Sequence, residues 1–149
     1  MKRRITTRGL IFKDGKIFAV THRRRNGDIA DYWCAPGGGL DEKESLIDGM
    51  IREMVEETGI KPDVGNLLMV QQYIKHKDQE LIEFFFHIKN SDDYLEIDLS
   101  KTTHGTDEIA QFGFVEPKSV NLKPAELVNI DFDPIIKGLT PTIVINSLK

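Results

Sequence analysis

The segment from Ser45 to Gly59 constrains the fold of this chain more than any other segment. Ser45 with Asp48 three residues later fits a capping box, and Gly59 is a residue type that ends helices in the left-handed conformation. Between these two ends the apolar residues follow one helical stripe: Ile47, Met50, Ile51, Met54 and Val55. The sequence therefore predicts a helix over residues 45–58 that packs one face against an apolar core.

The same helix carries an acidic face. Glu53, Glu56 and Glu57 lie at i, i+3 and i+4, which places three carboxylates within an arc of roughly 100°. The helix dipole disfavours anions in these last turns by about 0.3 to 1 kcal/mol each, so we expect a cation here. Carboxylates without His or Cys partners suit Mg²⁺ or Mn²⁺. Gly49 lies one turn earlier, and we expect it to leave room for a ligand. The alternative is a solvated face on which Arg52 pairs with Glu56.

A longer pattern surrounds this face. From Gly38 to Ile60 the chain reads GGLDEKESLIDGMIREMVEETGI. It resembles the Nudix box, in which a glycine, five residues, a glutamate and seven residues precede Arg-Glu-apolar-any-Glu-Glu-any-Gly-apolar. The matching positions keep every spacing: Gly38, Glu44, Arg52, Glu53, Met54, Glu56, Glu57, Gly59 and Ile60. The approach from Trp33 to Gly38 is also similar to the usual entry into the box.

On these residues the chain is identified as a member of the Nudix hydrolase family, whose MutT-like members hydrolyse nucleoside diphosphates linked to another group. The resemblance implies an α/β (α+β) fold, an α/β/α sandwich with a mixed β-sheet and a loop-helix-loop metal site. It also implies a ligand set, two bracing residues and a backbone contact to the substrate. The expected metal ligands are Glu53, Glu56, Glu57 and a carbonyl of Gly37 or Gly38; Glu44 and Arg52 brace the site; Gly37, Gly38 and Gly39 approach the substrate.

Two further candidates lie outside the box. The general base is expected either on the box helix or on a later loop, where Glu108 is the candidate and Asp107 its close rival. Arg23 belongs to a basic cluster over residues 22–25 that leaves a strand, and such a cluster can bind a substrate phosphate. A solvated loop acid and a solvated strand end are the respective alternatives.

The composition is that of an ordinary folded domain. The chain has 149 residues, 40% hydrophobic and 30% charged, with a formal net charge of −4. These values exclude disordered and collagen-like classes, and no run approaches the ~20 apolar residues of a membrane helix. The basic N-terminus lacks the apolar stretch of a signal peptide, so we expect one cytoplasmic domain over residues 1–149. Cys34 is the only cysteine, which excludes an internal disulfide; we expect it in the core.

Other elements are predicted from periodicity and turn residues. An N-terminal hairpin is expected from segments 4–12 and 16–23 around Asp14-Gly15. A strand pair is expected over 67–77 and 80–89, with the second strand central because Phe84, Phe85 and Phe86 are apolar on both faces. Further predictions are a strand over 109–115, helical turns near 117–120 and 124–128, and a strand within 140–149.

The resemblance implies a Mg²⁺- or Mn²⁺-dependent pyrophosphohydrolase. The family's markers for ADP-ribose, NADH or coenzyme A substrates are not recognisable, which favours a (d)NTP or a related small nucleotide. We expect no nucleic-acid or membrane partner, and either a monomer or a homodimer. Two alternatives stay open: a non-catalytic Nudix-fold nucleotide sensor and an isopentenyl-diphosphate-type isomerase. The intact carboxylate triad disfavours the sensor, and a single cysteine adjoining the box disfavours the isomerase.

Overall fold

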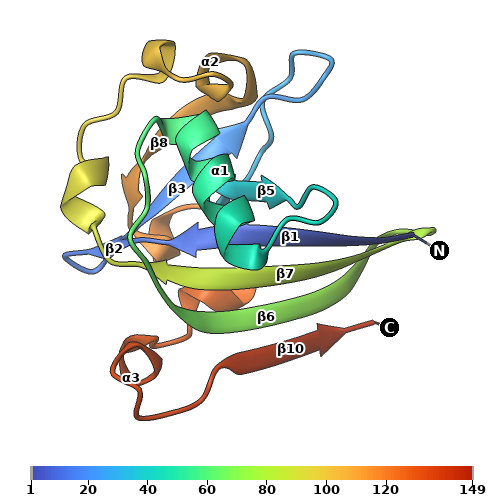
Figure 1. Ribbon diagram of the computed structural model, residues 1–149, viewed down its shortest axis with the longest axis vertical. Helices are drawn as coiled ribbons and strands as arrows, with labels where there is room; N and C mark the ends of the chain where they lie inside the picture. Colours follow the sequence, from blue (N-terminus) through green and yellow to red (C-terminus); the bar gives the residue numbers. More distant parts are fainter. Residues whose placement is uncertain (1, 149) are drawn as a thin grey trace.

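The computed structural model describes residues 2–148, whose strands form two β-sheets (Figure 1). The first sheet has the strand order β10-β6-β7-β1-β5. Its strands are β1 (Lys2–Leu10), β5 (Gly37–Gly39), β6 (Val64–His76), β7 (Gln79–Ile88) and β10 (Ile143–Ser147). The pairs β1–β7 and β10–β6 are parallel, whereas β6–β7 and β1–β5 are antiparallel. The sheet is therefore mixed, as predicted.

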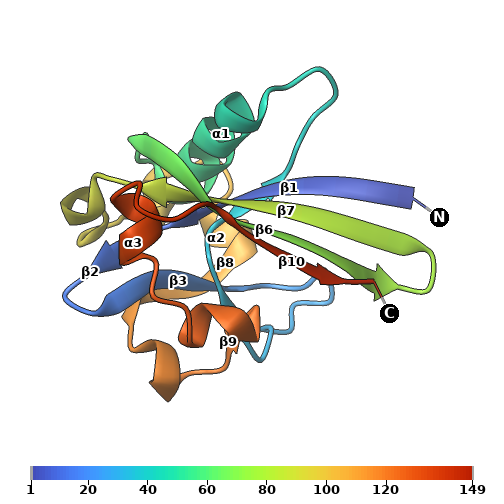
Figure 2. The ribbon, with the colours of Figure 1, turned by 90° about the horizontal axis from the view of Figure 1, so that it is seen from below.

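The second sheet is organised around one strand. It contains β2 (Phe12–Lys13), β3 (Lys16–His22), β4 (Trp33–Cys34), β8 (Ile109–Val115) and β9 (Leu122–Lys123). The strand β3 pairs antiparallel with β2, β4 and β8, and β9 adds a short parallel pairing to β4. Figure 2 shows α1 above the first sheet and β9 at the opposite side of the molecule.

The helix α1 (Leu46–Thr58) begins and ends where the sequence predicts. The Oγ of Ser45 accepts a hydrogen bond from the backbone N–H of Asp48 at 3.0 Å, and Gly59 ends the helix with φ +76°. The other helical segments are short: α2 (Gly105–Glu108), α3 (Asp133–Ile136), and the 3-10 turns η1 (Ser91–Tyr94), η2 (Leu99–Lys101), η3 (Pro117–Ser119) and η4 (Ala125–Val128). Among residues 2–148, no helix is long and apolar enough to cross a membrane.

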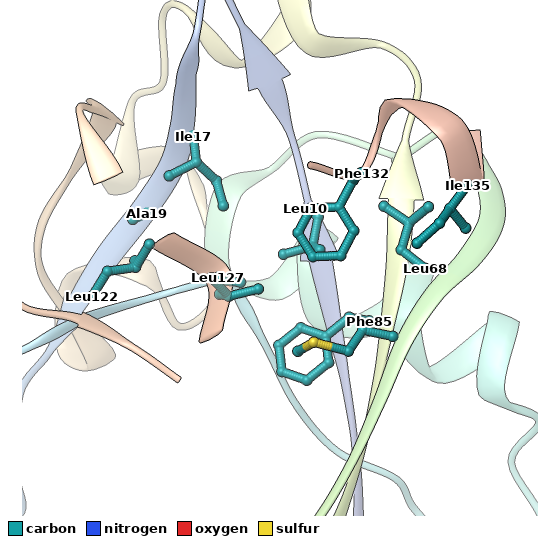
Figure 3. Packing of buried hydrophobic residues seen from close by; sticks show 11 residues of the cluster. Leu10, Ile17, Ala19, Leu68, Phe85, Leu122, Leu127, Phe132 and Ile135 are labelled. Carbon is teal, nitrogen blue, oxygen red and sulfur yellow. The ribbon is translucent and has the colours of Figure 1, made fainter. Parts of the chain in front are cut away.

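Two clusters of buried apolar side chains hold the layers together. One lies under α1 and joins Met50 and Met54 to Phe86. The other is closed by η4 and α3, and Phe85 is one of its members (Figure 3). Adjacent residues of β7 therefore face different clusters, as alternation along a strand requires. Helical segments lie on both sides of the sheets, so the α/β/α arrangement is confirmed, with only short turns in the second helical layer.

The predicted N-terminal hairpin is wrong in its first strand. Asp14 and Gly15 form the turn between β2 and β3, but β1 lies in the first sheet between β7 and β5. The chain changes sheets at Leu10 and Ile11, which are completely buried and belong to the two different apolar clusters. Both sides of this crossing are apolar, so the local pattern shows no boundary there.

The remaining strand predictions are confirmed. The pair expected over 67–77 and 80–89 is β6–β7, and β7 is the central strand of its sheet. The strand expected over 109–115 is β8, and the expected turns are η3 and η4. The C-terminal strand is β10, which lies beside β6 at the edge of the sheet. Lys149, the last residue of that prediction, lies outside the described residues.

Candidate metal and substrate site

Three glycines bring the backbone against the acidic face of α1. They form β5, which pairs with β1. A Cβ atom added to Gly37 would lie 2.0 Å from the carbonyl oxygen of Thr7, and one added to Gly38 would lie 2.5 Å from the carboxyl carbon of Glu53. Gly37 also has φ +144°, which residues with a side chain rarely adopt. The glycines therefore allow the chain to pass directly beside the carboxylates.

Arg52 connects this backbone to the acidic face. Its Nε and Nη2 donate to the two carboxylate oxygens of Glu44 at 2.7 and 2.9 Å, and Nη2 also donates to the carbonyl oxygen of Gly39 at 3.0 Å. Its Nη1 donates to Glu53 Oε1 at 3.0 Å and to Glu56 Oε2 at 3.2 Å. The hydrogen bonds from the guanidinium lower the pKa of Glu44 to about 2. One side chain thus fixes three carboxylates relative to β5.

Glu57 is the most deeply buried of these carboxylates, with 2% of the residue exposed. Its Oε2 accepts a hydrogen bond from the backbone N–H of Gly37 at 3.3 Å, and its Oε1 lies 3.6 Å from Nε2 of His22. The Nδ1 of His22 lies 3.4 Å from the Sγ of Cys34, which is buried as predicted. Burial lowers the pKa of His22, but hydrogen bonds to Cys34 and Glu57 outweigh it and raise the value to about 9.

The other two carboxylates of the face are partly buried. Burial raises the pKa of Glu53, and the charge of Glu57 raises it further, despite the hydrogen bond from Arg52. Oε2 of Glu56 lies 3.2 Å from Nδ1 of His104, a half-exposed residue. Burial, the larger cause, and the neighbouring carboxylate together outweigh the effect of Arg52 on the pKa of Glu53.

A cavity of about 540 Å³ adjoins this face. Alternate residues of β1, β6 and β7 line one side, and Tyr32, Cys34 and the segment 123–126 line the other. Its volume is typical of small-molecule sites. His22 lines the cavity and also contacts Glu57, so the cavity and the acidic face meet there. The basic side chains of the lining, besides His22, are Arg4, Arg8, Lys75 and Lys123.

Two predicted site residues belong neither to the acidic face nor to the cavity lining. Arg23 is exposed, and its backbone N–H donates to the carbonyl oxygen of Glu108 at 2.8 Å. The side chain of Glu108 is also exposed, at the end of α2. Burial raises the pKa of Glu108, and the charge of Glu57 raises it further, which places Glu108 within the electrostatic field of the acidic face. The roles of Arg23 and Glu108 stay predictions.

The family model described as NUDIX domain matches residues 2–135. The chain belongs to the Nudix family. The matched range includes α1, β5 and all of the cavity lining except Ser147 of β10. The family predicted from the box residues is confirmed.

Curated relatives match parts of this Nudix domain. An ADP-ribose pyrophosphatase of Methanocaldococcus jannaschii is 37% identical over 62 residues, which is 42% of this chain and 36% of the relative. The phosphatase NudJ of Escherichia coli is 30% identical over 88 residues, which is 59% of this chain and 56% of the relative. The chain thus spans between about a third and just over half of the length of these relatives.

Solved structures support the Nudix fold. A UDP-X diphosphatase crystal structure superposes with a TM-score of 0.72 at 23% identity, covering 97% of this chain and 68% of that chain. The solution structure of the Escherichia coli ORF135 protein superposes with a TM-score of 0.68 at 19% identity, covering 95% of both chains. At these identities the likeness concerns the fold alone.

Gly49 has a different role in this Nudix domain from the one its position suggests. It is buried, and a Cβ atom added there would lie 2.2 Å from Cδ2 of Leu40 and 3.1 Å from Oε1 of Glu44. The space that Gly49 leaves on α1 is therefore filled by the loop before the helix and is not open to a ligand. The prediction that Gly49 opens the face is wrong.

The donor set of the Nudix box fits a hard divalent cation by its chemistry. Glu53, Glu56 and Glu57 supply carboxylate oxygens beside backbone that only glycine permits. Among residues 2–148, however, no three His, Cys, Asp or Glu side chains converge closely enough to enclose a metal ion. The Nη1 of Arg52 bonds two of the carboxylates instead. A metal held by Glu53 and Glu56 would take over the bonds that this nitrogen now makes.

Proposed function

We propose that this Nudix domain hydrolyses a phosphoanhydride bond in a small nucleotide-like diphosphate substrate and depends on Mg²⁺ or Mn²⁺. The observation that carries the proposal is the position of Glu57. This buried carboxylate belongs to the acidic face and contacts His22, which lines the 540 Å³ cavity. An enzyme of this kind needs a cation site beside a pocket for the rest of the substrate. The family match and the intact box add support.

Glu53, Glu56 and Glu57 would hold the metal, and the backbone carbonyl of Gly38 is the further ligand that the family resemblance suggests. The bound cation supplies positive charge for the diphosphate and lowers the pKa of the attacking water. Three partly or fully buried carboxylates are suited to this task because burial strengthens their attraction for a cation.

The other side chains of the site would orient and move protons. Arg52 fixes the positions of Glu53 and Glu56 through Nη1 until a metal takes over these bonds, and Glu44 holds the guanidinium by two hydrogen bonds. Glu108 would accept the proton of the attacking water, and its raised pKa suits a group that must take up a proton near neutral pH. The backbone of Gly37 and Gly39 would lie along the substrate.

The substrate class is proposed as a (d)NTP or a related small nucleotide. The cavity is large enough for a nucleoside, and its basic residues suit the negative charge of phosphates. The names of the relatives, ADP-ribose pyrophosphatase and UDP-X diphosphatase, include nucleotide diphosphates with a second group attached, and these belong in any substrate panel. The expected cytoplasmic location and the monomeric or homodimeric state stay predictions.

The test is a nucleotide panel incubated with Mg²⁺ or Mn²⁺ and read by phosphate or pyrophosphate release. The wild type should release product from at least one member, and Glu56→Gln and Glu57→Gln should each abolish the metal-dependent release. Glu42→Gln is the matched control, because Glu42 is an exposed acid of the loop before α1 and is not a signature residue. Full activity in either box variant would overturn the site assignment.

Two other outcomes would favour the alternatives. Tight nucleotide binding without release from any member of the panel would favour a nucleotide sensor. Conversion of isopentenyl diphosphate without hydrolysis would favour an isomerase. Either result would overturn the proposed hydrolysis while leaving the family membership intact.

A further inference from the structure

Two buried hydrogen-bond acceptors face each other on the floor of the cavity. Gln71 of β6 and Glu83 of β7 are partners in the strand register, and both line the cavity. Their exposed fractions are 8% and 5%. In the described part of the chain, Oε1 of Gln71 has no hydrogen-bond partner. A buried polar atom of this kind is unfavourable unless something satisfies it, so a donor from a ligand would be stabilised here.

The carboxylate of Glu83 is fixed from one side. Its Oε2 accepts hydrogen bonds from Oγ1 of Thr6 at 2.9 Å and from Nε of Arg8 at 3.1 Å. The guanidinium of Arg8 keeps Glu83 paired, while another of its nitrogens, Nη1, donates to the carbonyl oxygen of Ala35 at 3.1 Å. Because both of these bonds end on Oε2, Oε1 is the oxygen left for a ligand donor, and it shares its surroundings with the hydroxyl of Tyr73, whose pKa is raised by burial and by Glu83.

The strand register shows how far this acceptor pair lies from the acidic face. Arg8 is opposite Phe85, Thr6 is opposite Glu83, and two residues further along β1 Arg4 is opposite Leu81. The side chain of Arg8 lies near the acidic face, since Nη1 also contacts the carbonyl oxygen of Gly37 at 3.5 Å. Two residues of a strand span about 7 Å. The acceptor pair therefore lies about one such step beyond the end where a diphosphate would bind.

The remaining lining suits a flat ring at that depth. Tyr32 and Tyr73 contribute aromatic side chains to the cavity, and Nζ of Lys123 lies 5.0 Å from the centre of the Tyr32 ring. Aromatic side chains bind planar rings by stacking. A carboxylate beside an unpaired amide oxygen attracts an N–H donor and repels a carbonyl oxygen.

We infer that Gln71 and Glu83 select substrates whose base carries an exocyclic amino group, such as adenine or cytosine, over keto counterparts such as hypoxanthine or uracil. This inference rests on the proposed function, because it takes the cavity to hold the nucleoside part of the substrate. The amino group donates its two hydrogens to the two acceptors. A keto oxygen in the same place brings like partial charge against the Glu83 carboxylate, which can only accept, and leaves Oε1 of Gln71 without a donor unless the amide turns its NH2 group inward.

The test measures binding in the absence of turnover. Calorimetric titration with adenosine monophosphate and inosine monophosphate, and with the cytidine and uridine pair, gives a preference ratio for each variant. The wild type should bind the amino member of a pair about 10- to 100-fold more tightly, as expected when buried polar groups lose their partners. Gln71→Met removes the amide at similar length and should lower the ratio roughly 3- to 10-fold, because the Glu83 carboxylate remains as the second acceptor. Glu83→Gln should reduce the ratio as well.

Gln72→Met is the matched control, because Gln72 is the next residue of β6 and does not line the cavity. It should keep the wild-type ratio. Glu83→Gln removes the partner of Arg8 and Thr6 and can fail to fold. In that case the preference ratio of Gln71→Met alone tests the inference. Equal binding of both members by the wild type, no binding of either at millimolar concentration, or an unchanged ratio in Gln71→Met would overturn the inference. A clear preference without any phosphate release would overturn the proposed hydrolysis only.

Discussion

Nε2 of His22 lies 3.6 Å from Oε1 of Glu57, and this contact joins the end of β3 to the last turns of α1. The same ring lies 3.4 Å from the thiol of Cys34 through Nδ1, so both ring nitrogens have a neighbour. Glu57 also accepts a hydrogen bond from the backbone of Gly37. Its two oxygens are thereby held from opposite elements, and the carboxylate has little freedom to turn away from the acidic face.

Replacing His22 should weaken metal binding without unfolding the protein. His22→Ala leaves Oε1 of Glu57 without its neighbour, and loss of a partner that orients a metal ligand typically costs 10- to 100-fold in affinity. We expect a loss of about that size in the Mn²⁺ dissociation constant, measured by electron paramagnetic resonance. His76→Ala is the control, because His76 is exposed near the far end of β6. Wild-type Mn²⁺ affinity in His22→Ala would show that Glu57 needs no such support.

Arg52 should not tolerate replacement by lysine. Its three nitrogens donate to Glu44, Glu53 and Glu56 at once, which a single ammonium group cannot do. Arg52→Lys should lose about 1 to 3 kcal/mol of unfolding free energy in urea titrations and at least about tenfold in kcat. Arg25→Lys, at an exposed loop position, should change neither value. A stable and fully active Arg52→Lys would mean that charge alone suffices at this position.

The sequence predicts the ends of α1 and its acidic face well because both depend on local spacing. The predicted apolar stripe is only partly right: Met50 and Met54 are buried, but Ile47 and Val55 are exposed. The Ser45 cap, the Gly59 end and the strand pair β6–β7 are all found as expected. What it could not predict is the meeting of distant segments. The strand β1 joins the other sheet, and the sequence does not show this because the crossing at Leu10 and Ile11 is apolar on both sides.

The same limit applies to the site. Leu40 fills the space beside Gly49. Because Leu40 lies in the loop before α1, the spacing of residues along the helix cannot predict this contact. His22, Gln71 and Glu83 have no motif around them, and their roles depend on pairings across strands. Arg4, Thr6 and Arg8 of β1 also line the cavity, but the sequence does not mark them. Arg3 and Thr7 beside them are polar as well, so β1 shows no alternation that would separate a cavity wall from a solvated face.

Glu44 should make the stability of the folded protein depend on pH in the acidic range. Hydrogen bonds from Arg52 lower the pKa of Glu44 from its ordinary value of 4.5 to about 2. A carboxylate with a depressed pKa stabilises the folded state above its unfolded pKa, and this contribution is lost as the pH falls from about 4.5 towards 2. The difference in urea midpoint between the wild type and Glu44→Gln should therefore be largest at neutral pH and shrink across that range. The difference in urea midpoint between the wild type and Glu42→Gln should not change with pH. A constant difference for Glu44→Gln would contradict the depressed pKa.

Glu108 should control the acidic limb of the rate profile if it is the general base. Burial raises its pKa above the ordinary value of 4.5, and the charge of Glu57 raises it further. A base acts only when deprotonated, so the rate should increase as the pH rises through this raised pKa and level off above it. Glu108→Gln removes the base and should reduce kcat about 100-fold or more, with the acidic limb flattened and thermal stability unchanged. Asp107→Asn tests the other candidate base, which lies on the same helical turn. This variant should keep both the wild-type rate and the acidic limb of the pH–rate profile. If Asp107→Asn loses the limb while Glu108→Gln keeps it, the two residues exchange roles; if both variants keep it, the base lies on α1.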